Sequence, residues 1–193
     1  MKLYWCPRTR AARALWMAEE LGRPYERVFV DIRDPDAEHD PDFLAASPMG
    51  KVPALVDGEV KMAESAAICL YLADRYSSGE LAPAVDAPER GRFLYWLFYS
   101  PGVIEPAMME KFTGSESNRS SAGWGDFPTM IETFEKGLAS GPWIMGDRFT
   151  AADVMLGSSA VFMRMFKVLP ESPVLEAYAD RPLKIGSFSA ASN

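Results

Sequence analysis

The sequence is poor in the residues that build metal centres and disulfide frameworks. Its 193 residues include two cysteines, Cys6 and Cys69, and one histidine, His39. Two cysteines do not make the disulfide framework of a small secreted domain. Without clustered cysteine and histidine, a structural zinc site is not expected either. The simplest interpretation is a reduced, cytoplasmic protein that binds no metal.

Long apolar runs and an excess of positive charge are also missing. No run of about 18 apolar residues occurs, so we expect no membrane span. The first ten residues, MKLYWCPRTR, lack the apolar region of a signal peptide. The formal net charge of −7 argues against a nucleic-acid-binding protein. The composition is that of an ordinary globular protein, with 48% hydrophobic and 24% charged residues.

The N-terminal part of the chain has the pattern of a small α/β domain. Strand patterns cover residues 2–5, 25–31, 54–56 and 59–62, and helical patterns cover 10–21, 43–46 and 64–76. The first three long elements form a β-α-β unit, which implies parallel strands with a right-handed crossover. Asp57-Gly58 separates the last two strands and is a strong hairpin signal. The order β-α-β, then β-β-α, suggests a thioredoxin-like module over residues 1–78.

The rest of the chain shows helical patterns only. The segment SSGELAPAVDAP at residues 77–88 is rich in turn signals and is the expected domain boundary. Helices are expected over 89–109 with a kink at Pro101-Gly102, over 127–138, from Thr150 and from Ser172. We therefore expect an all-helical domain over residues 86–185, with a mobile loop at 114–125 and a flexible tail at 186–193.

Four motifs, in order along the chain, resemble those of one enzyme family, the cytosolic glutathione transferases of the bacterial type. The motifs are RALWMAEELG (13–22), PMGKVPAL (48–55), ESAAI (64–68) and GDRFTAAD (146–153). They are similar in turn to the family's first helix, the pattern around its cis-proline, its acid-serine pair and the helix-capping motif of its second domain. Thr150 and Asp153 in the last motif are close to a capping box. The resemblance covers residues 1–182 and implies the use of glutathione and a homodimer.

The resemblance also implies which residues hold glutathione, a tripeptide with two carboxylates, one ammonium and one thiol. The backbone of Val52, before a cis Pro53, would pair with the cysteinyl part as in strand addition. Ser65 and the free N–H groups of a helix N-terminus suit the γ-glutamyl carboxylate. Glu64 would take the ammonium of the same group, and Lys51 would meet the glycine carboxylate.

Each of these residues also has an ordinary structural interpretation. Val52-Pro53 fits a trans-proline at a strand edge, and Lys51 fits a surface lysine. Glu64-Ser65 fits a solvated acid followed by a helix cap, which is the commoner use of such pairs. His39 falls near the place where some members have a ligand histidine, but its spacing to the next proline is shorter, so we expect it at the surface.

Two residues compete to activate the thiol, and both lie between a strand and a helix whose positive end they would feel. Thr9 occupies the place where many members of the family have a serine hydroxyl that donates to the glutathione thiolate. Cys6 occupies the place where glutaredoxin-like and omega-like members have a Cys-Pro nucleophile. The structural alternatives are a helix N-cap for Thr9 and a small buried hydrophobic residue for Cys6.

A second substrate would lie between the domains. Phe98, Gly102, Glu105 and Met109 share one face of the helix over 89–109 at 4-3-4 spacing. Aromatic and methionine side chains there suit an apolar electrophile. The alternative is that this stripe is ordinary core between the domains.

The sequence thus predicts an enzyme of detoxification that conjugates glutathione to a small apolar electrophile, with assistance from Thr9. The first alternative is a glutathione-dependent thiol transferase or reductase that acts through Cys6. The second alternative is a non-catalytic glutathione-binding protein of the same fold. Threonine in place of serine favours this alternative, as does the early Ser/Ala-rich tail after Gly186.

Overall fold

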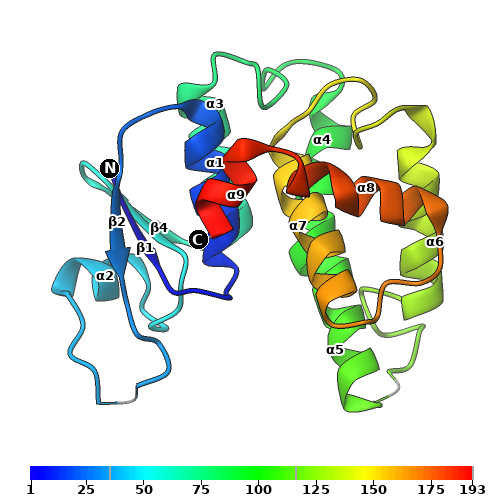
Figure 1. Cartoon of the computed structure of the whole chain (residues 1–193), viewed down its shortest axis with the longest axis horizontal. Helices are drawn as coiled ribbons and strands as arrows, with labels where there is room; N and C mark the ends of the chain where they lie inside the picture. Colours follow the sequence, from blue (N-terminus) through cyan, green and yellow to red (C-terminus); the bar gives the residue numbers. More distant parts are fainter. Residues whose placement is uncertain (35, 116, 193) are drawn as a thin grey trace. The chain divides into compact units, whose positions relative to one another are not determined.

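The computed structural model describes residues 1–34, 36–115 and 117–192, and the chain divides into two compact units (Figure 1). Unit 1 comprises residues 1–78 together with the C-terminal segment that begins at Ile185, and unit 2 comprises Gly79–Lys184. Glu116, in the predicted mobile loop, and Asn193, at the end of the predicted tail, lie outside the described residues. The break after Ser78 falls inside the segment predicted as the domain boundary.

Unit 1 is built on a mixed sheet with the strand order β2-β1-β3-β4. The strands are β1 (Lys2–Trp5), β2 (Glu26–Phe29), β3 (Ala54–Asp57) and β4 (Val60–Ala63). β1 runs parallel to β2 and antiparallel to β3. Leu3 and Tyr4 are both fully buried, because successive residues of β1 face opposite sides of a sheet that is covered on both sides. The predicted order, β-α-β followed by β-β-α, is confirmed.

The hairpin between β3 and β4 is shifted by one residue from the prediction. Asp57 pairs with Val60, so the two-residue loop is Gly58-Glu59 and not Asp57-Gly58. Gly58 has a φ of +62°, and glycine at the first loop position is typical of a type II′ turn. Asp57 stays in the strand, where its carboxylate accepts hydrogen bonds from two tyrosines of the following helix.

Helices cover both faces of the sheet in unit 1. They are α1 (Ala11–Leu21), α2 (Pro41–Ala46), α3 (Ser65–Tyr76) and α9 (Gly186–Ser192). Figure 1 shows α1, α3 and α9 on one side of the sheet and α2 on the other. Phe43 of α2 packs on Tyr4 of β1, with ring centroids 5.3 Å apart, in a core cluster that also contains Cys6 and Val52. Cys6, a predicted thiol activator, and Val52, a predicted glutathione-binding residue, therefore share one core.

The C-terminal segment forms the helix α9 where the sequence predicts a flexible tail. Phe188 of α9 is 8% exposed and packs edge to face on Trp16 of α1, with ring centroids 4.9 Å apart. Glu20 of α1 accepts a hydrogen bond from Trp16 Nε1 at 2.8 Å and another from the Ser187 hydroxyl. The small polar composition misled the prediction because it conceals one aromatic side chain, Phe188, that is buried against Trp16.

Unit 2 is built from helices. They are α4 (Arg90–Tyr99), the π-helical turn η1 (Ser100–Ile104), α5 (Glu105–Thr113), α6 (Phe127–Gly137), the 3₁₀ turn η2 (Leu138–Ser140), α7 (Ala151–Met165) and α8 (Pro173–Leu183). The predicted kink at Pro101-Gly102 takes the form of η1. Proline has no N–H to donate and its ring crowds the carbonyl four residues earlier, and a wider turn relieves both problems.

The helix α7 forms the core of unit 2, where it contacts α4 and α8. Every residue from Ala151 to Ala160 is buried. Thr150 and Asp153 form a capping box at its start. The Asp153 carboxylate accepts hydrogen bonds from the N–H of Thr150 at 2.9 Å, the N–H of Ile144 at 2.8 Å and the hydroxyl of Tyr178 at 2.8 Å. Burial raises the pKa of Asp153 to about 6.

Arg148 attaches the start of the predicted linker to unit 2. Its guanidinium donates hydrogen bonds to the carbonyl oxygens of Gly79, of Glu80 at 3.1 Å and of Ala82 at 3.1 Å. The linker segment is therefore held to the unit that follows it. None of the helices formed by the described residues is both long and apolar enough to cross a membrane.

Candidate functional site

The segment before β3 combines a tight turn with a cis peptide bond at Val52-Pro53. Gly50, at a φ of +63°, closes the turn by donating its N–H to the Ser47 carbonyl at 2.9 Å. The Lys51 N–H donates to the Ser47 hydroxyl at 3.0 Å, and the Lys51 side chain is exposed. Within the part of the chain that the structure describes, the N–H and C=O of Val52 have no hydrogen-bond partner. An extended peptide is a suitable partner for such backbone groups.

Glu64 and Ser65 form the junction between β4 and α3. Glu64 has a φ of +72°, in a region that L-residues rarely adopt. Such backbone strain costs about 1–3 kcal/mol and is typical of functional sites. The Glu64 side chain is exposed, whereas Ser65 is 6% exposed and begins the helix. The first N–H groups of α3 have no partner within a helix, so an anion is favoured at this end of the helix. The carboxylate of Glu64 lies next to this position in the chain.

Arg13 joins this junction to α1. It is 1% exposed, and its Nη1 donates to the Ser65 hydroxyl at 3.4 Å. A buried guanidinium adds positive charge beside the N-terminus of α3 and strengthens the preference for an anion. Sequence reasoning missed this role. The sequence does offer one signal for this role. Arg13 is a charged residue among Ala11, Ala14 and Leu15, which are all buried on the same helix.

Thr9 lies half-buried in the turn before α1. Its hydroxyl donates to the Cys6 carbonyl at 2.6 Å and accepts from the N–H of Ala11 at 3.2 Å. A hydroxyl has one proton to donate, so that proton is used here within the chain. The Thr9 oxygen nevertheless stays at the positive end of α1, where a developing anion is favoured.

Cys6 follows β1 and is 1% exposed. Its sulfur accepts a hydrogen bond from Arg33 Nη1 at 2.9 Å. The other terminal nitrogen of Arg33 donates to the Pro7 carbonyl at 2.8 Å. Sequence reasoning missed Arg33, because it lies in the connection after β2 and no spacing pattern links it to Cys6.

The residues predicted to line a second-substrate pocket belong to unit 2. Phe98 lies in α4, Gly102 in η1, and Glu105 and Met109 in α5. Phe98 is 46% exposed and Met109 is 56% exposed. The π-helical turn interrupts the regular α-helical spacing on which their common face was predicted. Their contact with a second substrate stays a prediction.

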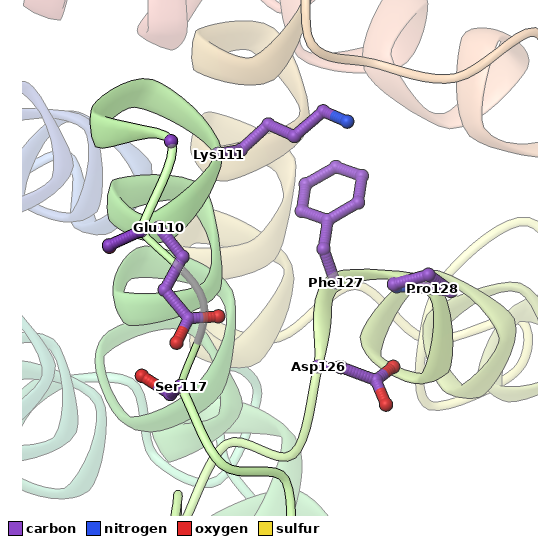
Figure 2. A pocket seen from close by; sticks show the side chains of 8 residues that line it. Glu110, Lys111, Ser117, Asp126, Phe127 and Pro128 are labelled. Carbon is purple, nitrogen blue, oxygen red and sulfur yellow. The ribbon is translucent and has the colours of Figure 1, made fainter.

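A hollow of about 480 Å³ lies between the end of α5 and the start of α6. It is lined by Glu110, Lys111, Gly114, Ser115, Ser117, Asp126, Phe127 and Pro128. Figure 2 shows the carboxylates of Glu110 and Asp126 on opposite sides of the view, with Phe127 between them. The hollow contains none of the four residues predicted for the second substrate.

The acidic and histidine side chains do not gather into a metal site in the described residues. No group of three or more His, Cys, Asp or Glu side chains there is placed to hold an ion. His39 is half-buried, and its ring packs edge to face on Phe43 with centroids 5.3 Å apart. His39 thus keeps part of its side chain at the surface while its ring packs on Phe43.

Comparison with known proteins decides the family. Residues 1–74 match the family described as Glutathione S-transferase, N-terminal domain, and residues 90–181 match Glutathione S-transferase, C-terminal domain. The chain belongs to the glutathione S-transferase family. The two matched ranges cover most of both units, so the predicted family and fold class are both confirmed.

Two curated relatives and one solved structure illustrate the range of this glutathione S-transferase family. Glutathione S-transferase hmp2 of Hypomyces subiculosus is 32% identical over 80% of this chain and 79% of its own length. The disulfide-bond oxidoreductase YfcG of Escherichia coli is 29% identical over 79% of this chain and 75% of its own length. A sphingomonad glutathione S-transferase in complex with glutathione superposes with a TM-score of 0.79 at 28% identity, covering 100% of this chain and 97% of that chain.

Proposed function

We propose that this member of the family is a glutathione transferase that joins the sulfur of glutathione to a small apolar electrophile. The observation that carries the proposal is the set of unused polar groups on unit 1. They are the backbone of Val52 and the N-terminus of α3, with the carboxylate of Glu64 beside it. Family membership supports glutathione as the ligand, as does the sphingomonad relative with glutathione bound.

Glutathione would bind as an extended tripeptide. The N–H and C=O of Val52, next to Pro53, would pair with its cysteinyl residue as one strand pairs with another. Ser65 and the first amides of α3 would donate to the γ-glutamyl carboxylate, and Glu64 would accept from the ammonium. Lys51, whose side chain is exposed, would meet the glycine carboxylate.

Thr9 would act on the thiol of bound glutathione. Its hydroxyl proton would turn from the Cys6 carbonyl to the glutathione sulfur while its oxygen still accepts from Ala11. A free thiol has a pKa of about 8.5, so lowering the value by about two units makes the thiolate the major form at neutral pH. The thiol proton leaves to solvent and the thiolate attacks the electrophilic carbon. A carbon–sulfur bond forms, and the leaving group departs with the electrons of its own bond.

The electrophile would contact the exposed apolar surface of α4 and α5. Phe98 and Met109 offer about half of their side chains for such a contact, and Gly102 and Glu105 lie between them in the chain. An aromatic ring and a thioether suit a polarisable aryl group.

Conjugation to a chromogenic aryl halide tests the proposal with three variants. Thr9→Ala should lower the rate by about tenfold or more, because one hydrogen bond to an anion is lost. Thr9→Ser keeps the hydroxyl and should stay close to the wild type. Cys6→Ala is the matched control and should leave conjugation intact. Loss of conjugation in Cys6→Ala with full activity in Thr9→Ala would overturn the assignment.

A second candidate function is reduction of glutathione-containing disulfides through Cys6. The contact of its sulfur with the Arg33 guanidinium favours this reading, and one relative is named a disulfide-bond oxidoreductase. The Cys6 thiolate would attack one sulfur of the disulfide, and a Cys6–glutathione disulfide would form as the other thiolate leaves. A second glutathione thiolate would then release Cys6 and form glutathione disulfide, so electrons balance.

The conjugation and reduction assays together also test a binding-only role. If the wild type binds glutathione yet shows neither activity, the chain is a non-catalytic glutathione-binding protein. Family membership further supports a homodimer that acts in detoxification in the cytoplasm. Light scattering that gives a 21.4 kDa particle would contradict the dimer.

A further inference from the structure

Arg33 contacts the Cys6 segment through both terminal nitrogens of its guanidinium. Nη1 donates to the Cys6 sulfur at 2.9 Å, and Nη2 donates to the Pro7 carbonyl at 2.8 Å. The base of the arginine is held as well, because its backbone N–H donates to the Asp31 carboxylate at 3.0 Å. A planar guanidinium can donate hydrogen bonds to two acceptors at once, so Arg33 holds the sulfur in a defined position.

Cys6 also belongs to an apolar part of the core of unit 1. Cys6 belongs to a buried cluster with Tyr4, Val30 and Val52, and Ile32 packs against it. The Thr9 hydroxyl bonds to the Cys6 carbonyl and not to its sulfur. The Arg33 guanidinium therefore contacts the sulfur of a buried cysteine directly.

Cys69 provides an internal contrast. It is fully buried, and its sulfur is 3.8 Å from the backbone carbonyl of Arg13. Burial raises the pKa of Cys69 to about 12, so it stays a neutral thiol at working pH. Because the chain has two cysteines, any thiolate signal near neutral pH belongs to Cys6.

We propose that Arg33 is the residue that activates Cys6, by stabilising its thiolate and orienting the sulfur for attack on a glutathione-containing disulfide. This inference rests on the second candidate function, reduction through Cys6. In the attack, a bond forms between the Cys6 sulfur and the glutathione sulfur, the bond between the two sulfurs of the disulfide breaks, and the other thiol leaves as a thiolate that takes a proton from solvent. The guanidinium gives up the sulfur as that bond forms and keeps its contact with Pro7.

The test compares the wild type with Arg33→Gln, Arg33→Lys and the control Arg8→Gln. Arg33→Gln keeps a hydrogen-bond donor and removes the charge, whereas Arg33→Lys keeps the charge and loses the fork. Arg8→Gln removes the same charge from an exposed residue two positions from Cys6. The readouts are the ultraviolet absorbance of the thiolate at neutral pH and the rate at which glutathione disulfide modifies Cys6, followed by mass spectrometry.

Arg33→Gln should slow the modification of Cys6 by about tenfold and lower the thiolate absorbance, because a charge-assisted hydrogen bond is lost. Arg33→Lys should fall between Arg33→Gln and the wild type, and Arg8→Gln should match the wild type. Unchanged modification in Arg33→Gln would overturn the assignment. Faster modification of Cys6 in Arg33→Gln would also overturn it, since Arg33 would then only block access to the sulfur.

The thiolate measurement separates this inference from the function on which it rests. If the thiolate absorbance depends on Arg33 but the protein shows no reductase turnover, the second candidate function is wrong and the role of Arg33 stands. If reductase turnover is the same in Arg33→Gln and Arg33→Lys as in the wild type, the second candidate function stands and the proposed role of Arg33 is wrong. Circular dichroism and glutathione affinity verify that each variant is folded.

Discussion

Thr9 and Cys6 differ in the hydrogen bonds that their side chains make. Thr9 has one hydroxyl proton, which now goes to the Cys6 carbonyl. Cys6 has a sulfur that faces a guanidinium and not that hydroxyl. The two residues are therefore not interchangeable activators. We propose Thr9 as the residue that acts on a bound thiol, and Cys6 as the reacting thiol of the second candidate function.

Glu64 gives a prediction at the level of one residue. Its φ of +72° strains an L-residue, and glycine adopts a positive φ at lower cost because it has no Cβ. Glu64→Gly should raise the free energy of unfolding by about 1 kcal/mol in urea titrations. The same variant should weaken glutathione binding about tenfold, because the ammonium loses its carboxylate.

Glu59→Gly is the matched control for this prediction. Glu59 is an exposed acid in the second loop position of the hairpin, and its φ is not positive. This variant should gain no stability and should bind glutathione like the wild type. If Glu64→Gly instead lowers stability, the strain at Glu64 does not exist in solution.

Sequence reasoning found the residues that follow a local pattern and missed those that depend on distant contacts. Pro53, Glu64 and Ser65 stand next to strand or helix boundaries, so turn and capping signals locate them. Arg13 and Arg33 matter because of where their guanidinium groups reach, across to Ser65 and to Cys6. The sequence separation of such pairs carries no periodic signal, so only the folded chain reveals them.

At the level of elements, the same distinction explains where the predictions differ from the structure. The hairpin is shifted by one residue because Asp57 is kept in β3 by side-chain contacts with α3. The kink at Pro101 is predictable from proline, but its form as a π-helical turn depends on neighbouring packing. The helix α9 depends on the contact of Phe188 with Trp16, which are 172 positions apart in the chain.

The capping box of α7 gives a prediction about pH. Asp153 has a pKa of 3.8 in the absence of the fold, and burial raises it to about 6. The folded state therefore binds this proton more tightly than the unfolded state. The stability that Asp153 contributes is full below about pH 4 and is lost as pH rises through about 6.

The comparison of the wild type with Asp153→Asn measures this contribution, because other titrating groups cancel. Asp153→Asn should be destabilised by about 2 kcal/mol, since an amide nitrogen faces the Thr150 N–H donor. The difference in unfolding free energy should shrink as pH rises from about 5 to about 7. A difference that grows with pH would mean that the hydrogen-bond donors hold Asp153 ionised.

The contact between α9 and α1 gives a further prediction at this level. Phe188→Ala should lower the free energy of unfolding by about 1–2 kcal/mol, less than a core phenylalanine, because a short terminal helix detaches and leaves no cavity. Hydrogen exchange should show loss of protection confined to α9. Val174→Ala, which trims a side chain that is 47% exposed, is the control and should have little effect. Loss of protection throughout unit 1 would contradict a local role.

At the level of the whole molecule, the proposed roles divide between the two units. The residues proposed for glutathione, among them Val52, Glu64 and Ser65, all lie in unit 1, and those proposed for the electrophile lie in unit 2. This division follows the two matched ranges of the glutathione S-transferase family. Glutathione binding should therefore survive changes at Phe98 or Met109 that reduce conjugation.

Calorimetric titration with glutathione tests the central claim most directly. The wild type should bind one glutathione per chain with a dissociation constant of about 1 mM or tighter. Ser65→Ala should weaken binding about tenfold, because the γ-glutamyl carboxylate loses a hydroxyl donor, while Ser121→Ala on an exposed loop of unit 2 should bind like the wild type. Absence of saturable binding at about millimolar glutathione, or equal binding by wild type and Ser65→Ala, would contradict the proposed site.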